Sequence, residues 1–180
     1  MADFSDHISD KLADFISQQP IFFVATAAEG SRINLSPKGM DSFRVLGPRQ
    51  AAYMDLTGSG NETSAHLKHD GRITVMFNSF TRNPLILRLY GRGHVARPGS
   101  PDYERHIGAF SLQPGARQLV FIEVESVQSS CGYAVPEMTL TSERPTLVRW
   151  AEKKGGDGLN AYRQQNNSLS IDGLDTGFND

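Results

Sequence analysis

The sequence predicts a mainly β protein, a small antiparallel barrel of about six strands with peripheral helices. Short runs rich in β-branched and aromatic residues recur along the chain, and turn signals separate them at close spacing. Two of these turns, at residues 29–31 and 47–50, join neighbouring runs as hairpins. Gly91 and Gly93 interrupt the longest run, as the bends of a small barrel require.

The composition fits one folded domain over residues 1–180, with 38% hydrophobic and 21% charged residues. The formal net charge is −2, so no basic field is available for nucleic acid. The apolar runs are too short to cross a membrane. Asp3, Asp6 and Asp10 stand where a signal peptide would carry positive charge, and a single cysteine excludes an internal disulfide framework. We expect a cytoplasmic protein with no nucleic-acid or membrane partner.

The first half of the chain should open with a helix. Apolar residues at helical spacing place its start near Phe4, with Ser5 as the N-cap, and its end before Pro20. A second, short helix carries Ala65 and Leu67. The alternation of apolar and polar residues between the turns predicts strands at residues 21–27, 32–36, 43–46 and 51–54.

The second half continues the sheet and then changes character. Strands are expected at residues 73–77, 85–95 and 118–127, with a helix that starts at residues 98–101 and runs through Phe110. Residues 128–180 form a helical and irregular C-terminal extension. Its first helix covers residues 145–154 and ends at two glycines, and residues 159–165 add a further helical turn or two.

Two polar segments at strand ends predict a cradle for a phosphate group. They are NLSPKG at residues 34–39 and DLTGSGNET at residues 55–63. Glycines let backbone N–H groups converge on an anion, and the helix that follows adds its positive end. The candidate side-chain donors are Asn34, Ser36, Lys38, Ser59, Asn61 and Thr63. The alternative is a helix N-cap with nothing bound and a solvated Lys38. A Rossmann site is not expected, because Thr63 replaces the third glycine of that fingerprint.

Other chemistry-bearing residues give weaker signals. Arg82 and Arg88 are charges at a strand edge or barrel mouth from which a phosphate can be reached. The five histidines are scattered without metal-ligand spacing, so no metal site is assigned. Cys131 is expected to be a small buried residue, because no histidine or acid stands at a spacing that would make it a nucleophile. No side chain is assigned a catalytic role.

The order of these segments resembles the pyridoxamine 5'-phosphate oxidase-like, FMN-binding split-barrel family. The likeness covers roughly residues 21–127. It rests on FFVATA at 22–27, NLSPKG at 34–39, the strand ending at Asp55, the loop and helix through Leu67, and the strand at 73–77. The C-terminal piece, with CGYAVP at 131–136 and SIDGL at 170–174, resembles an uncharacterised branch of that family.

The resemblance implies a split β-barrel that forms a homodimer with two FMN sites at the subunit interface. Lys38 and residues 61–63 would hold the flavin phosphate, while Asn34 and Ser36 would face the ring or the ribityl chain. The implied activity is that of an FMN-dependent oxidoreductase with an unknown small-molecule substrate. The alternative is a non-catalytic flavin- or haem-binding sensor on the same barrel, and F420 is a further candidate cofactor.

The sequence departs from the true oxidases at the start of the short helix. Those enzymes have Ser-Arg-Lys there, whereas this chain has Asn61, Glu62 and Thr63. Two cations that bind phosphate are replaced, one of them by a carboxylate, so Glu62 should turn away or pair with Arg82 or Arg88. The C-terminal Trp and Arg segment of the true oxidases has no match either. Oxidation of pyridoxamine phosphate itself is therefore not expected.

Overall fold

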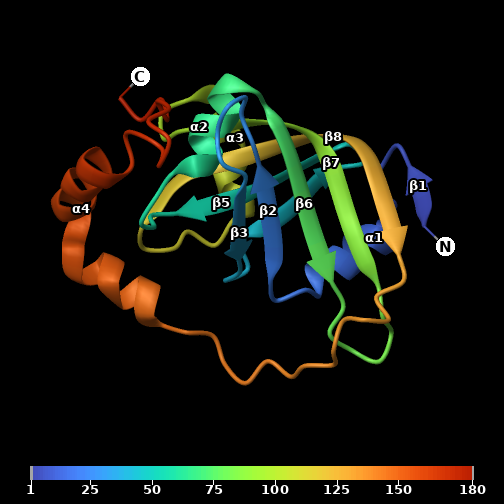
Figure 1. Cartoon of the computed structure of the whole chain (residues 1–180). Coiled ribbons are helices and arrows are strands. Elements are labelled where there is room, and N and C mark those ends of the chain that lie inside the picture. Colours follow the sequence, from blue (N-terminus) through green and yellow to red (C-terminus); the bar gives the residue numbers. More distant parts are fainter. Residues whose placement is uncertain (1, 180) are drawn as a thin grey trace.

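The computed structural model describes residues 2–179 and shows an open antiparallel sheet that curls into a barrel, with helices at its rim (Figure 1). The elements follow one another as β1 (Asp3–Ser5), α1 (Asp10–Ser17), β2 (Phe22–Thr26), β3 (Asn34–Lys38), β4 (Phe43–Gly47), β5 (Gln50–Leu56), α2 (Glu62–His69), β6 (Arg72–Asn78), β7 (Ile86–Ala96), α3 (Pro101–His106), η1 (Ile107–Ala109), β8 (Ala116–Ser130) and α4 (Thr146–Asn166).

The strand order in the sheet is β3-β2-β6-β7-β8-β5-β4, and β1 pairs with β8 beside this path. Every pairing is antiparallel, as predicted, and the hairpins at residues 29–31 and 47–50 are confirmed. The sheet has eight strands, more than the expected six or so, and β1 matches none of the strand segments expected from the sequence. The expected start of the first helix was wrong: residues 3–5 pair with β8, and α1 begins at Asp10 with Ser9 as its N-cap.

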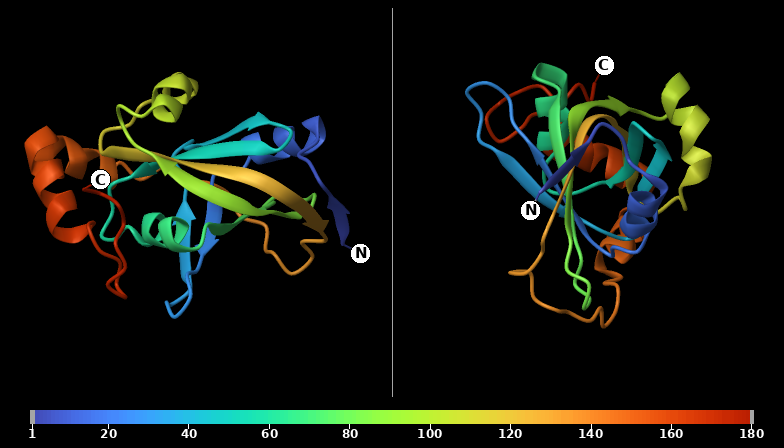
Figure 2. Two further views of the ribbon diagram at one scale, coloured as in Figure 1. Left: turned by 90° about the horizontal axis from the view of Figure 1, so that it is seen from above. Right: turned by 90° about the vertical axis from the view of Figure 1, so that its right-hand side faces the viewer.

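Two apolar clusters pack on the two faces of β5 and β8. The cluster inside the barrel contains Phe22, Val24, Val75, Leu89 and Ile122, all of them buried. The second lies under α3, which covers the outer face of the same strands (Figure 2). Because β8 is covered on both faces, residues 117–122 are buried without alternation.

A bulge in β7 confirms the predicted role of one glycine. The pairing register of β7 with β8 shifts between Tyr90 and Gly91. A Cβ atom added at Gly91 would lie 1.9 Å from the carbonyl oxygen of Glu123, so only glycine allows the two backbones to approach this closely. The bulge bends the long β7–β8 ribbon across the barrel.

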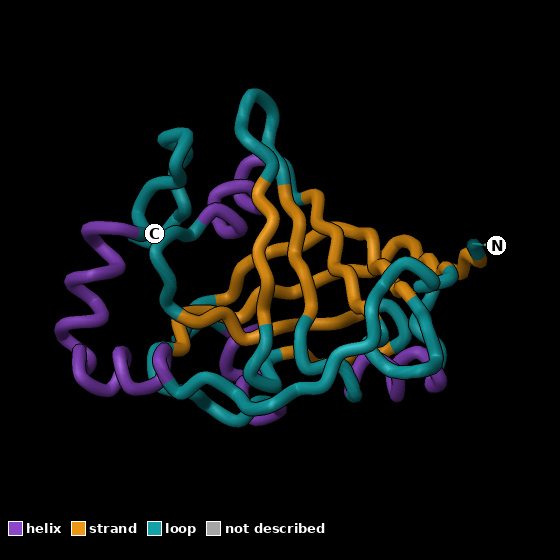
Figure 3. Tube along the Cα trace, turned by 60° about the horizontal axis from the view of Figure 1, so that its bottom comes forward, coloured by secondary structure: helices purple, strands orange, loops and turns teal. Residues whose placement is uncertain are grey.

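The C-terminal extension leaves the sheet after β8 and passes along one side of it. Residues 131–145, here called the strap, run across the open end of the barrel to α4 (Figures 1 and 3). Cys131 is exposed at the start of the strap, so the expected burial of this residue was wrong. Helix α4 is kinked at Gly155, whose φ is 65°. Within residues 2–179, no helix has the length and apolar character needed to span a membrane.

Candidate functional site

A row of polar side chains joins β3 to β5, which are not paired through their backbones. The register pairs Lys38 with Phe22 and Asn34 with Thr26, so the polar residues of β3 share the face of the buried side chains of β2. Across the gap, β5 presents Tyr53 and Asp55. We call this row the polar seam; it comprises Asn34, Ser36 and Lys38 of β3, Tyr53 and Asp55 of β5, and Thr63 of α2.

The buried carboxylate of Asp55 binds the polar side chains at the Lys38 end of the seam, here called its lower part. Lys38 Nζ lies 2.8 Å from Asp55 Oδ1, and Arg117 of β8 donates two hydrogen bonds to Asp55 Oδ2 at 2.6 and 3.1 Å. Gln118 Nε2 donates to the same oxygen at 2.9 Å. Burial alone would raise the pKa of Asp55, but the charges of Arg117 and Lys38 outweigh it and hold that pKa well below its ordinary range. Two cations thus share one anion, and the cluster carries one surplus positive charge.

The upper part of the seam is a chain of neutral hydrogen bonds centred on Asn34. Its Nδ2 donates to Thr26 Oγ1 and to Thr63 Oγ1, both at 3.1 Å, and its Oδ1 accepts from Ser36 Oγ at 2.9 Å. Thr26 Oγ1 lies 3.1 Å from Nδ1 of the buried His66. The amide of Asn34 has therefore satisfied both of its hydrogens and is fixed in one orientation. The hydroxyl hydrogen of Thr63 is left to donate to another acceptor.

Further hydrogen-bond donors lie at Tyr53 in the seam and at the start of α2. The hydroxyl of Tyr53, which lies beside Thr63, is fully buried and makes no hydrogen bond within residues 2–179. Burial raises the pKa of Tyr53, and the charge of Asp55 raises it further, so the hydroxyl stays protonated as a donor. Asn61, the N-cap of α2, does not cap the helix, because its Oδ1 accepts from Gln118 instead. The side chain of Asn61 therefore leaves the N–H groups of the first helical turn uncapped.

Residues 167–178, here called the tail, fold back over the outer side of the start of α2 (Figure 2). Ser64 Oγ donates to the carbonyl oxygen of Thr176 at 2.8 Å, and Arg117 donates to Asn167 Oδ1 at 2.8 Å. The amide of Ile171 donates to the carboxylate of Glu62 at 3.0 Å. Glu62 is thus turned to the tail, as one of the two expectations required, and pairs with neither Arg82 nor Arg88.

The structure brings most of the predicted site residues together. Asn34, Ser36 and Thr63 are joined directly, and Lys38 is linked to Asn61 through Asp55 and Gln118. Two predicted residues stand apart. Ser59 is exposed in the loop before α2, and Arg82 is exposed in the β6–β7 turn, at the far end of β6 from α2.

Sequence reasoning missed the residues that tie the seam together. The missed residues in or beside the seam are Tyr53, Asp55, Arg117 and Gln118. In addition, Arg163 of α4 donates to Thr57 Oγ1 at the start of the loop between β5 and α2. A signal existed for two of them. Arg117 and Gln118 are a charged and a polar residue directly before the apolar run at 119–122 of β8, where a buried polar pair needs a partner.

An apolar groove of about 1,120 Å³ opens beside the lower end of the seam, between the barrel and the strap. Lys38 belongs to both, because its side chain also lines the groove. The other walls come from Phe23, Met40 and Phe80 of the barrel side and from Met138, Leu140 and Trp150 of the extension. The amide of Met138 donates to the carbonyl oxygen of Phe80 at 3.0 Å, which fixes the strap at this wall.

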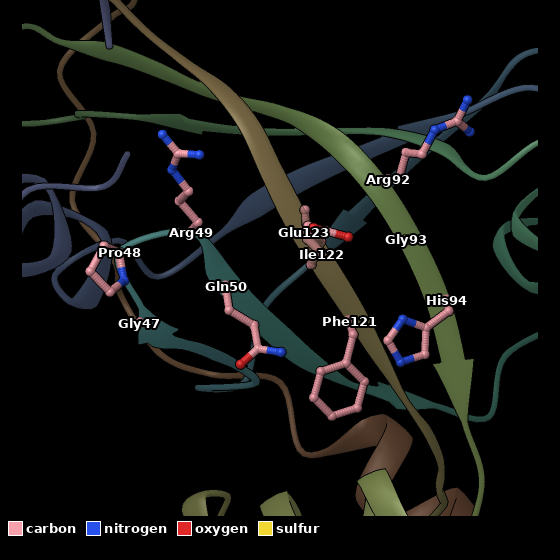
Figure 4. Close-up of a pocket in the computed structure, with 10 residues that line it drawn as sticks. All are labelled: Gly47, Pro48, Arg49, Gln50, Arg92, Gly93, His94, Phe121, Ile122 and Glu123. Atoms are coloured by element: carbon pink, nitrogen blue, oxygen red, sulfur yellow. The ribbon is translucent and has the colours of Figure 1, made fainter. Parts of the chain in front are cut away.

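A second hollow, of about 700 Å³, lies on the outer face of β7, β8 and β5 (Figure 4). His94 stacks on Phe121 at its edge, with ring centroids 5.0 Å apart. Its two arginines are engaged elsewhere: Arg49 pairs with Asp6, and Arg92 donates to the carbonyl oxygen of Asp70. Within residues 2–179, no group of three or more metal-ligating side chains gathers here or elsewhere.

Known proteins share both the sequence pattern and the fold. The sequence pattern of the family described as pyridoxamine 5'-phosphate oxidase matches residues 8–131. A pyridoxamine 5'-phosphate oxidase family protein of Aspergillus flavus, UstO, is 41% identical over 189 residues, which cover 95% of this chain and 76% of that protein.

Two solved structures have a similar fold at low identity. HupZ of Group A Streptococcus has a TM-score of 0.53 at 23% identity, over 67% of this chain and 91% of that one. The FAD binding protein of Mycobacterium smegmatis has a TM-score of 0.52 at 11% identity, over 69% of this chain and 96% of that one. The architecture is a split barrel, as expected, and the chain belongs to the pyridoxamine 5'-phosphate oxidase family.

Proposed function

We propose that this protein is a flavin-dependent oxidoreductase with FMN as its cofactor. The observation that carries the proposal is the surplus positive charge of the Lys38–Asp55–Arg117 cluster, which lies in the polar seam together with the unpartnered hydroxyl of Tyr53. A buried surplus charge is costly without a counter-ion, and a phosphate group supplies one. Family membership supports a flavin, and a structural neighbour of Mycobacterium smegmatis is an FAD binding protein.

The donor set of the seam fits a phosphate-bearing cofactor. Thr63, the first-turn N–H groups of α2 and the Tyr53 hydroxyl would hold the anion, and Lys38 would add charge from the side of the groove. The tail shields the outer side of α2 from water, which strengthens each of these interactions. Glu62 does not oppose the anion, because the tail binds its carboxylate.

The flavin supplies the redox chemistry when it is bound, and the chain supplies position and environment. Asn34 and Ser36 would orient the cofactor with side chains whose hydrogen bonds already fix their direction. Hydride transfer needs no general acid or base from the protein, and we assign none. The groove beside Lys38 would admit the substrate.

We further propose that the protein works as a homodimer, with the cofactor at the subunit interface. The outer face of the β2–β3 hairpin exposes large apolar side chains, with Ile33 at 78% and Leu35 at 65% exposure. An apolar patch on an edge strand is typical of an interaction surface. Replacement of Leu35 by Asp should yield a monomer in sedimentation measurements, whereas Leu112→Asp, at an exposed site outside this face, should not. A dimer in both variants would place the interface elsewhere.

Reconstitution with FMN tests the cofactor assignment. The purified protein, after addition of FMN and removal of the excess, should retain the visible absorption of bound flavin. Lys38→Ala should weaken the affinity by about tenfold or more, since a charge-assisted contact is lost. Lys153→Ala, at an exposed position on α4, is the matched control and should bind as the wild type does.

The remaining outcomes separate the alternatives. Bleaching of the bound flavin by NAD(P)H would identify an enzyme, and a stable flavin would identify a carrier or sensor. An intense Soret band in place of the flavin spectrum would identify haem. A colourless protein that binds no FMN would overturn the proposal and direct the test to F420.

A further inference from the structure

We propose that the apolar groove binds an uncharged aromatic substrate, and that the strap and Trp150 select it. This inference rests on the proposed function, because it places the substrate beside the flavin. The true oxidases of the family act on a phosphorylated substrate, and the groove of this chain is built for a different class of molecule.

The groove is large enough for a small-molecule ligand. Its volume of about 1,120 Å³ is close to the upper end of the range of about 300–1,000 Å³ that is typical of ligand pockets. Three aromatic rings, those of Phe23, Phe80 and Trp150, and two methionines line it. Aromatic walls bind planar apolar molecules by burial and ring packing, and thioethers adapt to their outline.

The charges at the groove are already matched. Lys38 is held by Asp55, and the surplus charge of that cluster faces the seam, where the cofactor phosphate would use it. The other cation of the lining, Arg144, is exposed on the strap directly after the exposed Glu143, so these two residues add no net charge to the lining. A phosphorylated substrate would have to compete for Lys38 or bury its charge without a partner, which is costly.

The walls are held in place before any ligand arrives. The ring of Trp150 packs edge-on against Tyr162 at 5.1 Å, and Lys154 Nζ lies over both rings. On the opposite wall, Met40 adopts a φ of 63° and Asp41 a φ of 51°, which are unfavourable for residues with side chains. Strain of this kind concentrates at ligand sites, and here it directs Met40 into the groove.

The single tryptophan provides a direct test, because the only Trp of the chain lines the groove. Its fluorescence is titrated with 4-phenylbutanol and with 4-phenylbutyl phosphate, which differ only in the phosphate group. The protein carries no flavin, and saturating inorganic phosphate occupies the proposed anion site of the seam. The alcohol should change the emission saturably. The phosphate ester should bind about tenfold more weakly or worse, because its charge is desolvated without a partner.

One strap variant and one control variant locate the binding. Leu140→Asp should weaken the alcohol about tenfold, since it removes apolar wall and adds a charge. Leu140 is 57% exposed, so this change should leave folding intact. Leu112→Asp, at 66% exposure outside the groove, is the matched control and should leave the affinity unchanged.

Each other result contradicts the proposal in a distinguishable way. Equal or tighter binding of the phosphate ester would mean that Lys38 is available and that the substrate is phosphorylated. Emission that changes only when the protein is diluted would mean that a second copy of the chain fills the groove. FMN retention is measured separately: alcohol binding in a chain that retains no flavin would overturn the oxidoreductase and, with it, the role of the groove as a substrate site.

Discussion

The two sides of the barrel are joined in different ways. On one side, β7 and β8 pair through their backbones from Ile86 and Ser130 to Ala96 and Leu119. On the other side, β3 and β5 meet only through the side chains of the polar seam, chiefly the Lys38–Asp55 pair. In a backbone ladder, the N–H and C=O groups of the two strands are already bound to each other. Polar side chains, in contrast, can exchange a protein partner for a ligand. This difference is the reason why we propose the seam, and not the β7–β8 side, as the cofactor site.

The first prediction removes the buried carboxylate of the seam, for which we expect the largest loss of stability. Asp55→Ala should lower the free energy of unfolding by about 3–5 kcal/mol, because Lys38 and Arg117 then lie close together without their shared counter-ion. Urea unfolding measures this loss. Asp6→Ala, which removes the exposed partner of Arg49, is the control and should have no measurable effect. Equal effects of the two changes would show that the seam contributes no more than a surface ion pair.

The second prediction concerns the other side of the barrel, where β7 and β8 pair through their backbones. Leu89 is fully buried in the barrel, and Leu89→Ala should cost about 2–5 kcal/mol through the cavity it leaves. FMN affinity, measured at a temperature where the variant is folded, should stay unchanged, because Leu89 lies in the apolar core cluster and the cofactor donors lie in the seam. A loss of affinity as large as that of Lys38→Ala would mean that the two sides are not separable.

The third prediction uses pH to isolate the seam carboxylate. The pKa of Asp55 is lowered in the folded state, so its contribution to stability is present above the ordinary carboxyl pKa and is lost as the pH falls below it. Between about pH 5 and about pH 3, the wild type should lose stability more steeply than Asp55→Asn, which cannot titrate at this position. Parallel curves for the two proteins would show that Asp55 does not contribute to the acid sensitivity.

The fourth prediction concerns the upper seam, where the bonds are neutral. Thr63→Val removes one acceptor of the Asn34 amide and should cost about 1 kcal/mol of stability. It should also weaken FMN by about tenfold, because the hydroxyl is a proposed ligand of the phosphate. Ser59→Ala, in the exposed loop before α2, serves as the comparison and should change neither quantity. Unaltered FMN affinity in Thr63→Val would remove this residue from the site.

The smallest effect is expected at Arg82. This residue was a candidate ligand from its sequence context, but it lies exposed at the far end of β6 from α2. Arg82→Ala should therefore change FMN affinity by less than about twofold, the scale of a screened surface charge. A tenfold loss would show that the residue reaches the cofactor in the dimer.

Local signals in the sequence determined much of this fold. The turns at residues 29–31 and 47–50 and the glycines of β7 led to the correct hairpins and the correct bulge, because turn chemistry and backbone approach depend on a few adjacent residues. The first helix was misplaced for a tertiary reason. Phe4 fits a helical pattern, but the sheet edge at β8 offers backbone partners to residues 3–5.

Only part of the candidate site could be predicted from the sequence. The two polar segments stood out because strand ends and glycines are local features, and the structure joins Asn34, Ser36 and Thr63 by hydrogen bonds. Asp55 with Arg117, and Ser64 with Thr176, are contacts between segments 62 and 112 residues apart, which no local pattern encodes. The strap as a wall of the groove was likewise invisible, because its apolar residues follow no regular period.

The return of the tail to α2 has a consequence for biosynthesis. Ser64 emerges from the ribosome 112 residues before Thr176, its partner in the folded chain. At about 5–20 residues per second, the start of α2 is synthesised about 6 to 22 s before the segment that covers it. During this interval the start of α2, where we propose that the flavin phosphate binds, is not yet covered by the tail. Binding of FMN to the nascent chain would therefore precede the contacts of the tail with Ser64 and Glu62.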